Sequence, residues 1–72
     1  MENKKFGEYL RRLREARGLS QFQLGKIVGV SDKAVSKWEN GYAKPKGSIV
    51  LKLSETLAVS AEQLLKEMYE EE

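Results

Sequence analysis

Two lysines and several short polar residues lie between a pair of glycines in the segment GVSDKAVSKWENG, residues 29–41. Lys33 and Lys37 are four residues apart, a spacing that places both on one face of a helix. An ammonium group can donate to guanine O6 or N7, and the Asp32 carboxylate can accept from cytosine N4. Such a set of side chains is typical of a helix that reads base edges in a major groove. The candidates for contact with a base or a groove edge are Ser31, Asp32, Lys33, Ser36 and Lys37.

Catalytic and metal-binding chemistry finds little support in the composition. The 72 residues contain neither histidine nor cysteine, so the commonest general base, metal ligand and thiol nucleophile are all absent. The carboxylates are scattered along the chain rather than clustered, and they form no catalytic constellation. We therefore expect a protein that is not an enzyme and that uses no cofactor and no metal.

Charge is distributed unevenly along the chain. Residues 1–59 carry twelve Lys or Arg side chains against six acidic ones, whereas residues 60–72 carry one lysine and five glutamates. The body therefore has a net charge of +6 and the tail −4, within a total of +2. A basic body with an acidic tail fits a polyanionic partner, and it fits equally well the solvated surface of a small helical protein.

The segment that carries the two lysines has the signals of a short helix with both ends marked. Gly29 suits the positive φ of a sharp turn, and Ser31 is a favourable N-cap residue. Val35 and Trp38 recur at helical spacing and supply an apolar inner face. Gly41 stands where helices commonly end in the left-handed conformation.

Four other helices are predicted from capping residues and from apolar residues at helical spacing. Ser20 and Gln23 form one capping box, and Ser60 and Gln63 form a second. Gly25, inside the second helix, costs about 1 kcal/mol relative to alanine, so we expect it to permit a close helix–helix approach. The predicted helices span about residues 4–17, 21–28, 31–40 and 48–57, with a fifth from residue 60 onward.

The organisation expected from these signals is a single domain over residues 1–72. Its core would cover about residues 6–66, and residues 67–72 would be an acidic, frayed tail, because glutamates at a helix C-terminus oppose the helix dipole. No apolar run approaches the roughly 20 residues that span a bilayer, and the N-terminus lacks the apolar segment of a secretory signal. We therefore expect a soluble, cytoplasmic protein without a membrane partner.

The order and spacing of these residues resemble those of the Cro/repressor (XRE-type) helix-turn-helix family over about residues 6–66. The resemblance implies an all-α, compact five-helix domain of the lambda-repressor-like type, with the helix-turn-helix formed by the second and third helices. It also implies a sequence-specific transcriptional regulator, a repressor, that binds double-stranded DNA with its third helix in the major groove. The residues that carry the resemblance are Leu19, Ser20, Gln21, Leu24, Gly29, Val30, Ser31, Val35, Trp38, Glu39, Asn40, Gly41, Pro45, Leu53, Leu57, Val59, Ser60, Leu64 and Leu65.

Several contacts with the DNA backbone follow from the same resemblance. Gln21, at the start of the second helix, would meet a phosphate, although it could also be only a first-turn residue. Asn40 would meet another phosphate just after the third helix, would terminate that helix, or would do both. Lys44 and Lys46 lie in the following loop, where the family grips the DNA backbone. The two lysines of the third helix could likewise contact phosphate, or only water.

Other matched positions are structural. Arg14 and Glu39 match a pair that forms a largely buried ion pair between the first and third helices of the family. Trp38 is expected in the core, on the same face as its apolar neighbours. Phe22 and Ile27 occupy positions that are usually polar in the family, so these two apolar side chains would face solvent or a partner.

Two modes of action are compatible with this sequence. One such domain contacts only a few base pairs, so a homodimer on an inverted repeat is the expected DNA-binding form. The alternative is a protein–protein interaction module on the same fold, such as an antitoxin or a transcriptional adaptor, with Phe22, Ile27 and Tyr42 as its contacts. The dimer candidates, all on the fifth helix, are Leu65, Met68 and Tyr69.

Overall fold

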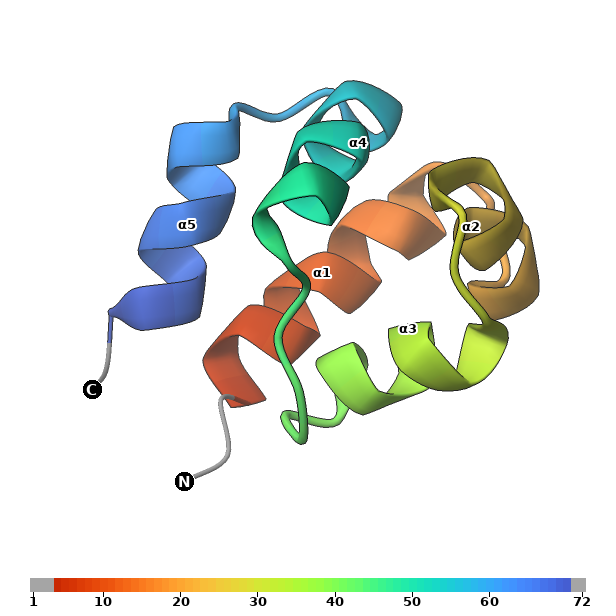
Figure 1. Cartoon of the computed structure of the whole chain (residues 1–72), viewed down its shortest axis with the longest axis horizontal. Helices are drawn as coiled ribbons and strands as arrows, with labels where there is room; N and C mark the ends of the chain where they lie inside the picture. The colour runs from red at the N-terminus through yellow and green to blue at the C-terminus, as the bar shows by residue number, and fades with distance from the viewer. Residues whose placement is uncertain (1–3, 71–72) are drawn as a thin grey trace.

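The computed structural model describes residues 4–70, and this part of the chain consists of five α-helices without a strand (Figure 1). It measures 30 × 22 × 22 Å along its principal axes. The predicted all-α, five-helix domain is confirmed, with α2 and α3 as the helix-turn-helix. The helices are α1 (Lys4–Ala16), α2 (Gln21–Val28), α3 (Asp32–Glu39), α4 (Gly47–Leu57) and α5 (Ala61–Tyr69).

The apolar core lies around α1, which packs against both α3 and α5. α2 packs against α3 and α4, and α4 also packs against α5, so each helix buries one face (Figure 1). Burying such apolar faces is the main favourable contribution to folding. The buried apolar side chains are Phe6, Leu10, Leu24, Val28, Val35, Trp38, Val50, Leu53, Leu57, Leu64 and Met68.

The first predicted capping box is present, and the second is only half formed. The Ser20 hydroxyl accepts from the backbone N–H of Gln23, whose side chain accepts from the backbone N–H of Ser20. The Ser60 hydroxyl likewise accepts from the backbone N–H of Gln63. The Gln63 amide, however, donates to Glu67 at 3.1 Å, which lies one turn further along α5. The Gln63 side chain is thus directed along α5 towards Glu67, and its oxygen does not complete the box at Ser60.

The ends of four helices differ from the sequence-based expectation, and α3 is one residue shorter at each end, from Asp32 to Glu39. α1 ends one residue early, at Ala16, and α4 begins one residue early, at Gly47. The frayed tail predicted from residue 67 is wrong for residues 67–69, because α5 continues to Tyr69. Met68 is 1% exposed, so its burial against the core outweighs the unfavourable acidic charges nearby. Residues 71 and 72 of the predicted tail lie outside the described residues.

None of the helices formed by residues 4–70 has the length and apolar character needed to cross a membrane.

Candidate nucleic-acid interface

The turn that aims α3 is built from two glycines and a capping serine. Gly29 has φ +85°, and the backbone N–H groups of Gly29 and Val30 both donate to the carbonyl of Gly25 at 2.8 Å. A Cβ at Gly25 would lie 2.6 Å from the Val30 carbonyl oxygen. Gly25 therefore permits a close approach of the turn backbone, and not the helix–helix approach that the sequence suggested. Ser31 then begins α3 by accepting from the backbone N–H of Ala34 at 3.1 Å.

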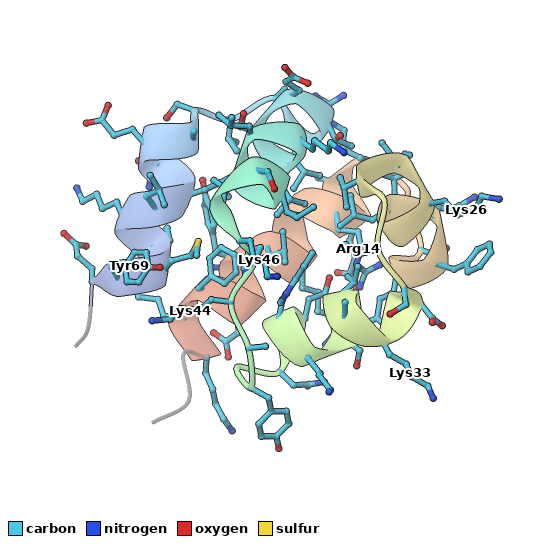
Figure 2. All side chains as sticks on the ribbon, viewed as in Figure 1. Arg14, Lys26, Lys33, Lys44, Lys46 and Tyr69 are labelled. Carbon is cyan, nitrogen blue, oxygen red and sulfur yellow. The ribbon has the colours of Figure 1, made fainter. Side chains whose placement is uncertain are left out.

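The inner face of α3 is anchored in the core, and its outer face carries the predicted cations. Val35 is fully buried and Trp38 is 5% exposed, so Trp38 is a core residue, as expected. Asp32, Lys33 and Lys37 are exposed on the other side of the helix. The side chain of Lys33 extends away from the body of the domain (Figure 2). The core thus fixes the position of α3, while the ammonium groups of Lys33 and Lys37 remain exposed to a ligand. A helix that reads base edges needs both features.

Three of the polar candidates already have partners within the protein. The Ser31 hydroxyl is the N-cap acceptor of α3. The Asn40 amide nitrogen donates to the carbonyl of Ser36 at 2.9 Å and to the Ser36 hydroxyl at 3.2 Å. Asn40 therefore ends α3 through its own side chain, as one of the two expectations had it. These bonds hold the three side chains at the ends of α3 and on its outer face.

A buried ion pair connects the last turns of α1 and α3. Arg14 and Glu39 are 8% and 9% exposed, and Arg14 Nε donates to Glu39 Oε2 at 2.6 Å. Arg14 Nη2 donates to Glu39 Oε1 at 3.0 Å, and Nη1 donates to the Leu19 carbonyl at 2.7 Å. The hydrogen bond with Glu39 raises the pKa of Arg14 above its usual value, although burial opposes this. The structure thus contains the ion pair implied by the resemblance.

The side chain of Gln21 reaches this ion pair. Its Nε2 donates to Glu39 Oε1 at 3.1 Å, and the residue is half-buried at the first position of α2. From the sequence, Gln21 was expected to meet a phosphate or to be only a first-turn residue, and the bond to Glu39 was not foreseen. A second feature was also missed: a Cβ at Gly7, within α1, would collide with the Glu39 carbonyl. A glycine inside a helix was the available signal for this close contact.

The two loop lysines are both exposed and differ in their contacts within the protein. Lys44 is exposed, and its Nζ lies 4.4 Å from the centre of the Tyr69 ring, towards α5 (Figure 2). Lys46 is exposed and is the N-cap residue of α4, where it makes no side-chain capping bond. The sequence gave no sign of the contact between Lys44 and Tyr69, which joins a predicted phosphate ligand to a predicted dimer residue.

The dimer candidates on α5 divide into two groups. Leu65 and Tyr69 are 42% and 63% exposed, so both can meet a partner. Met68 is 1% exposed and belongs to the core, so its assignment to a dimer surface is wrong. Met68 lies four residues after the fully buried Leu64, and this helical spacing places both on the inner face.

Other large apolar side chains are exposed on the outside of the domain. Phe22 and Ile27 on α2 are 60% and 55% exposed, as the sequence predicted, and Tyr42 is 69% exposed. Lys26 Nζ lies 5.9 Å from the centre of the Phe22 ring. Leu51 on α4 is 59% exposed and was not singled out from the sequence. These side chains are exposed and therefore available to a partner.

Comparison with known proteins identifies the fold and the family. A helix-turn-helix family model matches residues 10–64. Repressor protein C2 of Salmonella phage P22 is 41% identical over 66 residues, which cover 92% of this chain and 31% of the phage protein. The HTH-type transcriptional repressor RghR of Bacillus subtilis is 44% identical over 61 residues, covering 83% of this chain and 45% of RghR. The chain thus spans less than half the length of either relative.

A solved structure agrees with these relatives. The P22 c2 repressor in its crystal complex with a synthetic operator superposes with a TM-score of 0.81 at 42% identity. The match covers 86% of this chain and 94% of that one. Sequence, family model and backbone geometry therefore agree over nearly all of the five helices. The chain belongs to the Cro/repressor-type helix-turn-helix family.

Proposed function

We propose that this protein is a sequence-specific, double-stranded DNA-binding transcriptional regulator that acts as a repressor. The observation that carries this proposal is the geometry of α3. Its apolar face is locked into the core by Val35 and Trp38, while Lys33 and Lys37 are exposed on the opposite face. The similar P22 c2 repressor was solved in complex with a synthetic operator, and this similarity supports DNA as the partner of this chain. As a DNA-binding protein it would act in the cytoplasm.

In the proposed complex, α3 enters the major groove and reads base edges. Lys33 and Lys37 would donate to guanine O6 and N7, and Asp32 could accept from cytosine N4. Gln21 and the lysines of the loop after α3 would bind phosphates and fix the register of the domain on the duplex. The exposed side chains of Leu65 and Tyr69 on α5 would pair two copies on an inverted repeat, with half-sites about one helical turn apart.

The test is selection from a pool of randomised duplexes, followed by affinity measurements at two salt concentrations. We expect a two-fold symmetric site to be enriched, with binding that weakens steeply as salt rises, because phosphate contacts release counterions. Lys33→Ala should then relax the preference at one base pair of each half-site, at a cost of about 1–3 kcal/mol. Weak binding shared by all duplexes would contradict sequence-specific readout.

A second candidate function is a protein–protein module, such as an antitoxin or a transcriptional adaptor. The observation that favours it is the exposure of Phe22, Ile27 and Tyr42, three large apolar side chains. Aromatic anchors of this kind are common at the centres of protein interfaces. An affinity for a protein partner that is lost in Phe22→Ser/Ile27→Ser and is insensitive to salt would favour this function over DNA binding.

A further inference from the structure

We propose that Glu39 is a positioning residue for DNA binding, because its carboxylate orients the Gln21 side chain towards a phosphate. This inference rests on the proposed function and adds a role that neither residue type nor position in the sequence reveals. Glu39 is buried at the end of α3 and cannot itself approach a phosphate, which carries the same sign of charge. Its effect on DNA must therefore pass through the side chain that it bonds.

The carboxylate of Glu39 is held in place by Arg14, independently of its bond with Gln21. Arg14 donates to both of its oxygens, at 2.6 and 3.0 Å, and a third guanidinium nitrogen donates to the Leu19 carbonyl. Charge-assisted bonds in this paired geometry are stronger and more directional than neutral ones. The close packing of Gly7, which lies on the same helix as Arg14, against the Glu39 backbone also fixes this end of α3. Glu39 Oε1 is thus a fixed acceptor beside the first turn of α2.

Gln21 uses one of its two amide hydrogens on this acceptor. Its Nε2 lies 3.1 Å from Glu39 Oε1, and this is the only bond of its side chain to residues 4–70 of the protein. The amide is planar, so fixing one N–H also fixes the direction of the second N–H and of the carbonyl oxygen. A residue that is only half-buried leaves this second N–H within reach of a ligand. The bond to Glu39 therefore occupies one N–H of the Gln21 amide and orients the other N–H for a ligand.

Fixing the donor in advance removes part of the entropic cost of binding. A free glutamine side chain at a helix start would lose rotamer freedom when it bonds a phosphate, and this loss lowers affinity. In the free protein, the hydrogen bonds from Arg14 to Glu39 and from Gln21 to Glu39 already restrict these side-chain rotations. Removing the acceptor should therefore weaken the phosphate contact even though Gln21 itself is intact.

The experiment compares two variants on the duplex enriched by selection. Gln21→Met removes the amide and keeps the ion pair, whereas Arg14→Met/Glu39→Met removes the acceptor without leaving a buried charge unpaired. Each phosphate of the duplex is replaced singly by an uncharged methylphosphonate, and the loss of affinity is measured at every position. Circular dichroism and urea unfolding establish that each variant is folded at the temperature of the binding assay.

For the wild-type protein we expect one phosphate in each half-site at which methylphosphonate lowers affinity roughly tenfold through loss of the Gln21 contact. The part of this penalty that depends on Gln21 should be lost in Gln21→Met and clearly reduced in Arg14→Met/Glu39→Met, while the penalties at other phosphates remain as internal controls. Adding Gln21→Met should therefore have a smaller effect in the double variant than in the wild-type protein. In 15N spectra of the free protein, one Gln21 amide proton should be protected from exchange, and the double variant should lose this protection.

Two outcomes would overturn the inference and leave DNA binding intact. The Gln21-dependent penalty could persist undiminished in Arg14→Met/Glu39→Met, which would limit Glu39 to a structural role. Alternatively, the penalty could be the same in the wild-type protein and in Gln21→Met at every phosphate, which would show that Gln21 contacts no phosphate. If the wild-type protein bound no duplex even at low salt, the proposed function would fail instead, and the inference with it.

Discussion

The guanidinium of Arg14 donates to both carboxylate oxygens of Glu39, and this pair bonds the last turn of α1 to the last turn of α3. Their side chains alone, without the backbone, are 10% and 4% exposed, so both are almost fully removed from solvent. Burying two charges is costly, so such a pair contributes less to stability than its short distances suggest, whereas losing one partner is strongly destabilising. The net contribution of the pair to stability is therefore small compared with the cost of removing one of its partners.

The first prediction concerns the stability contributed by this pair. Glu39→Met should lower the free energy of unfolding by about 3–5 kcal/mol, because it leaves the Arg14 guanidinium buried without a counter-charge. Arg14→Met/Glu39→Met should recover most of this loss, since both desolvated charges are gone. Urea unfolding followed by circular dichroism measures both values. Equal losses in the single and double variants would contradict this account of the pair.

The C-terminal end of α4 provides the second prediction. Ala58 has φ +59° and is the one residue other than glycine with positive φ among residues 4–70. A residue with a Cβ costs roughly 1–2 kcal/mol in the left-handed region, and glycine avoids this cost. Glycine has more conformational freedom in the unfolded chain, so part of the gain is lost again on folding. Ala58→Gly should therefore stabilise the domain by about 1 kcal/mol, which raises its Tm by about 4–8 °C.

A matched control for this substitution lies in α1. Ala16 is also exposed, but it is the last residue of α1 and has an ordinary negative φ. Ala16→Gly should therefore lower stability, by up to about 1 kcal/mol. Opposite signs at the two alanines would show that backbone conformation is the cause. A loss of stability in both variants would mean that Ala58 is not strained.

Helix boundaries and the core could largely be predicted from the sequence, because their signals are local. Ser20 with Gln23, and the glycines at positions 29 and 41, mark the helix ends through backbone chemistry that depends on few neighbours. Met68 was misassigned although its four-residue spacing from Leu64 pointed inward. The apolar Leu65 beside them obscured which face of α5 packs on α1, and only the tertiary arrangement resolves this choice.

The candidate site could be predicted only as a set of positions. The bond from Gln21 to Glu39 joins residues 18 apart in the chain, and its existence depends on how α1, α2 and α3 pack. The contact of Lys44 with Tyr69 likewise depends on the rotamer of a long side chain and on the position of α5. Residue type and helical spacing carry no information about such contacts, whereas they did identify the exposed cations of α3.

The third prediction is a loss of stability at alkaline pH that depends on Tyr9. Burial, and secondly the negative charge of Glu67, raise the pKa of Tyr9 above its usual value of 10.0. Above pH 10 the unfolded chain loses this proton while the folded protein retains it, so stability falls as pH rises through this range. Below pH 10 both states are protonated and the effect is absent.

Replacing this side chain by phenylalanine isolates the contribution of its hydroxyl group. Tyr9→Phe should have a shallower fall of unfolding free energy above pH 10 than the wild-type protein, with parallel curves between pH 7 and 9. Denaturant unfolding at a series of pH values gives both curves. Parallel curves throughout the alkaline range would show that Tyr9 ionises equally well in the folded and unfolded states.

The fourth prediction concerns the contact of Lys44 with Tyr69. The ammonium lies over the ring in the free protein and must leave it to bind a phosphate, so the contact opposes DNA binding. An exposed cation–π contact contributes about 0.5–1 kcal/mol, and Tyr69→Leu should therefore tighten binding about two- to fivefold. Lys44→Ala should weaken binding and reduce the slope of log affinity against log salt by about 0.9.

The double variant distinguishes this effect from a change in dimerisation. If Tyr69 acts through Lys44, then Tyr69→Leu should have no effect on affinity in the Lys44→Ala background. If Tyr69 acts through a dimer surface, its effect should be the same in both backgrounds. Titrations at two or more salt concentrations provide the affinities and the slopes.

The fifth prediction separates the two apolar side chains of α5 that the sequence grouped together. Leu65 is 42% exposed, so Leu65→Lys should leave folding intact and, if α5 forms the dimer surface, should reduce the sedimenting mass to that of one chain. Met68→Lys should instead unfold the domain, because Met68 is 1% exposed and an unpaired ammonium there cannot be solvated. If folded Leu65→Lys still sediments as a dimer, Leu65 does not belong to the dimer surface. Because one domain contacts only a few base pairs, the monomeric variant should also lose affinity for the two-fold site and retain weak binding to a single half-site.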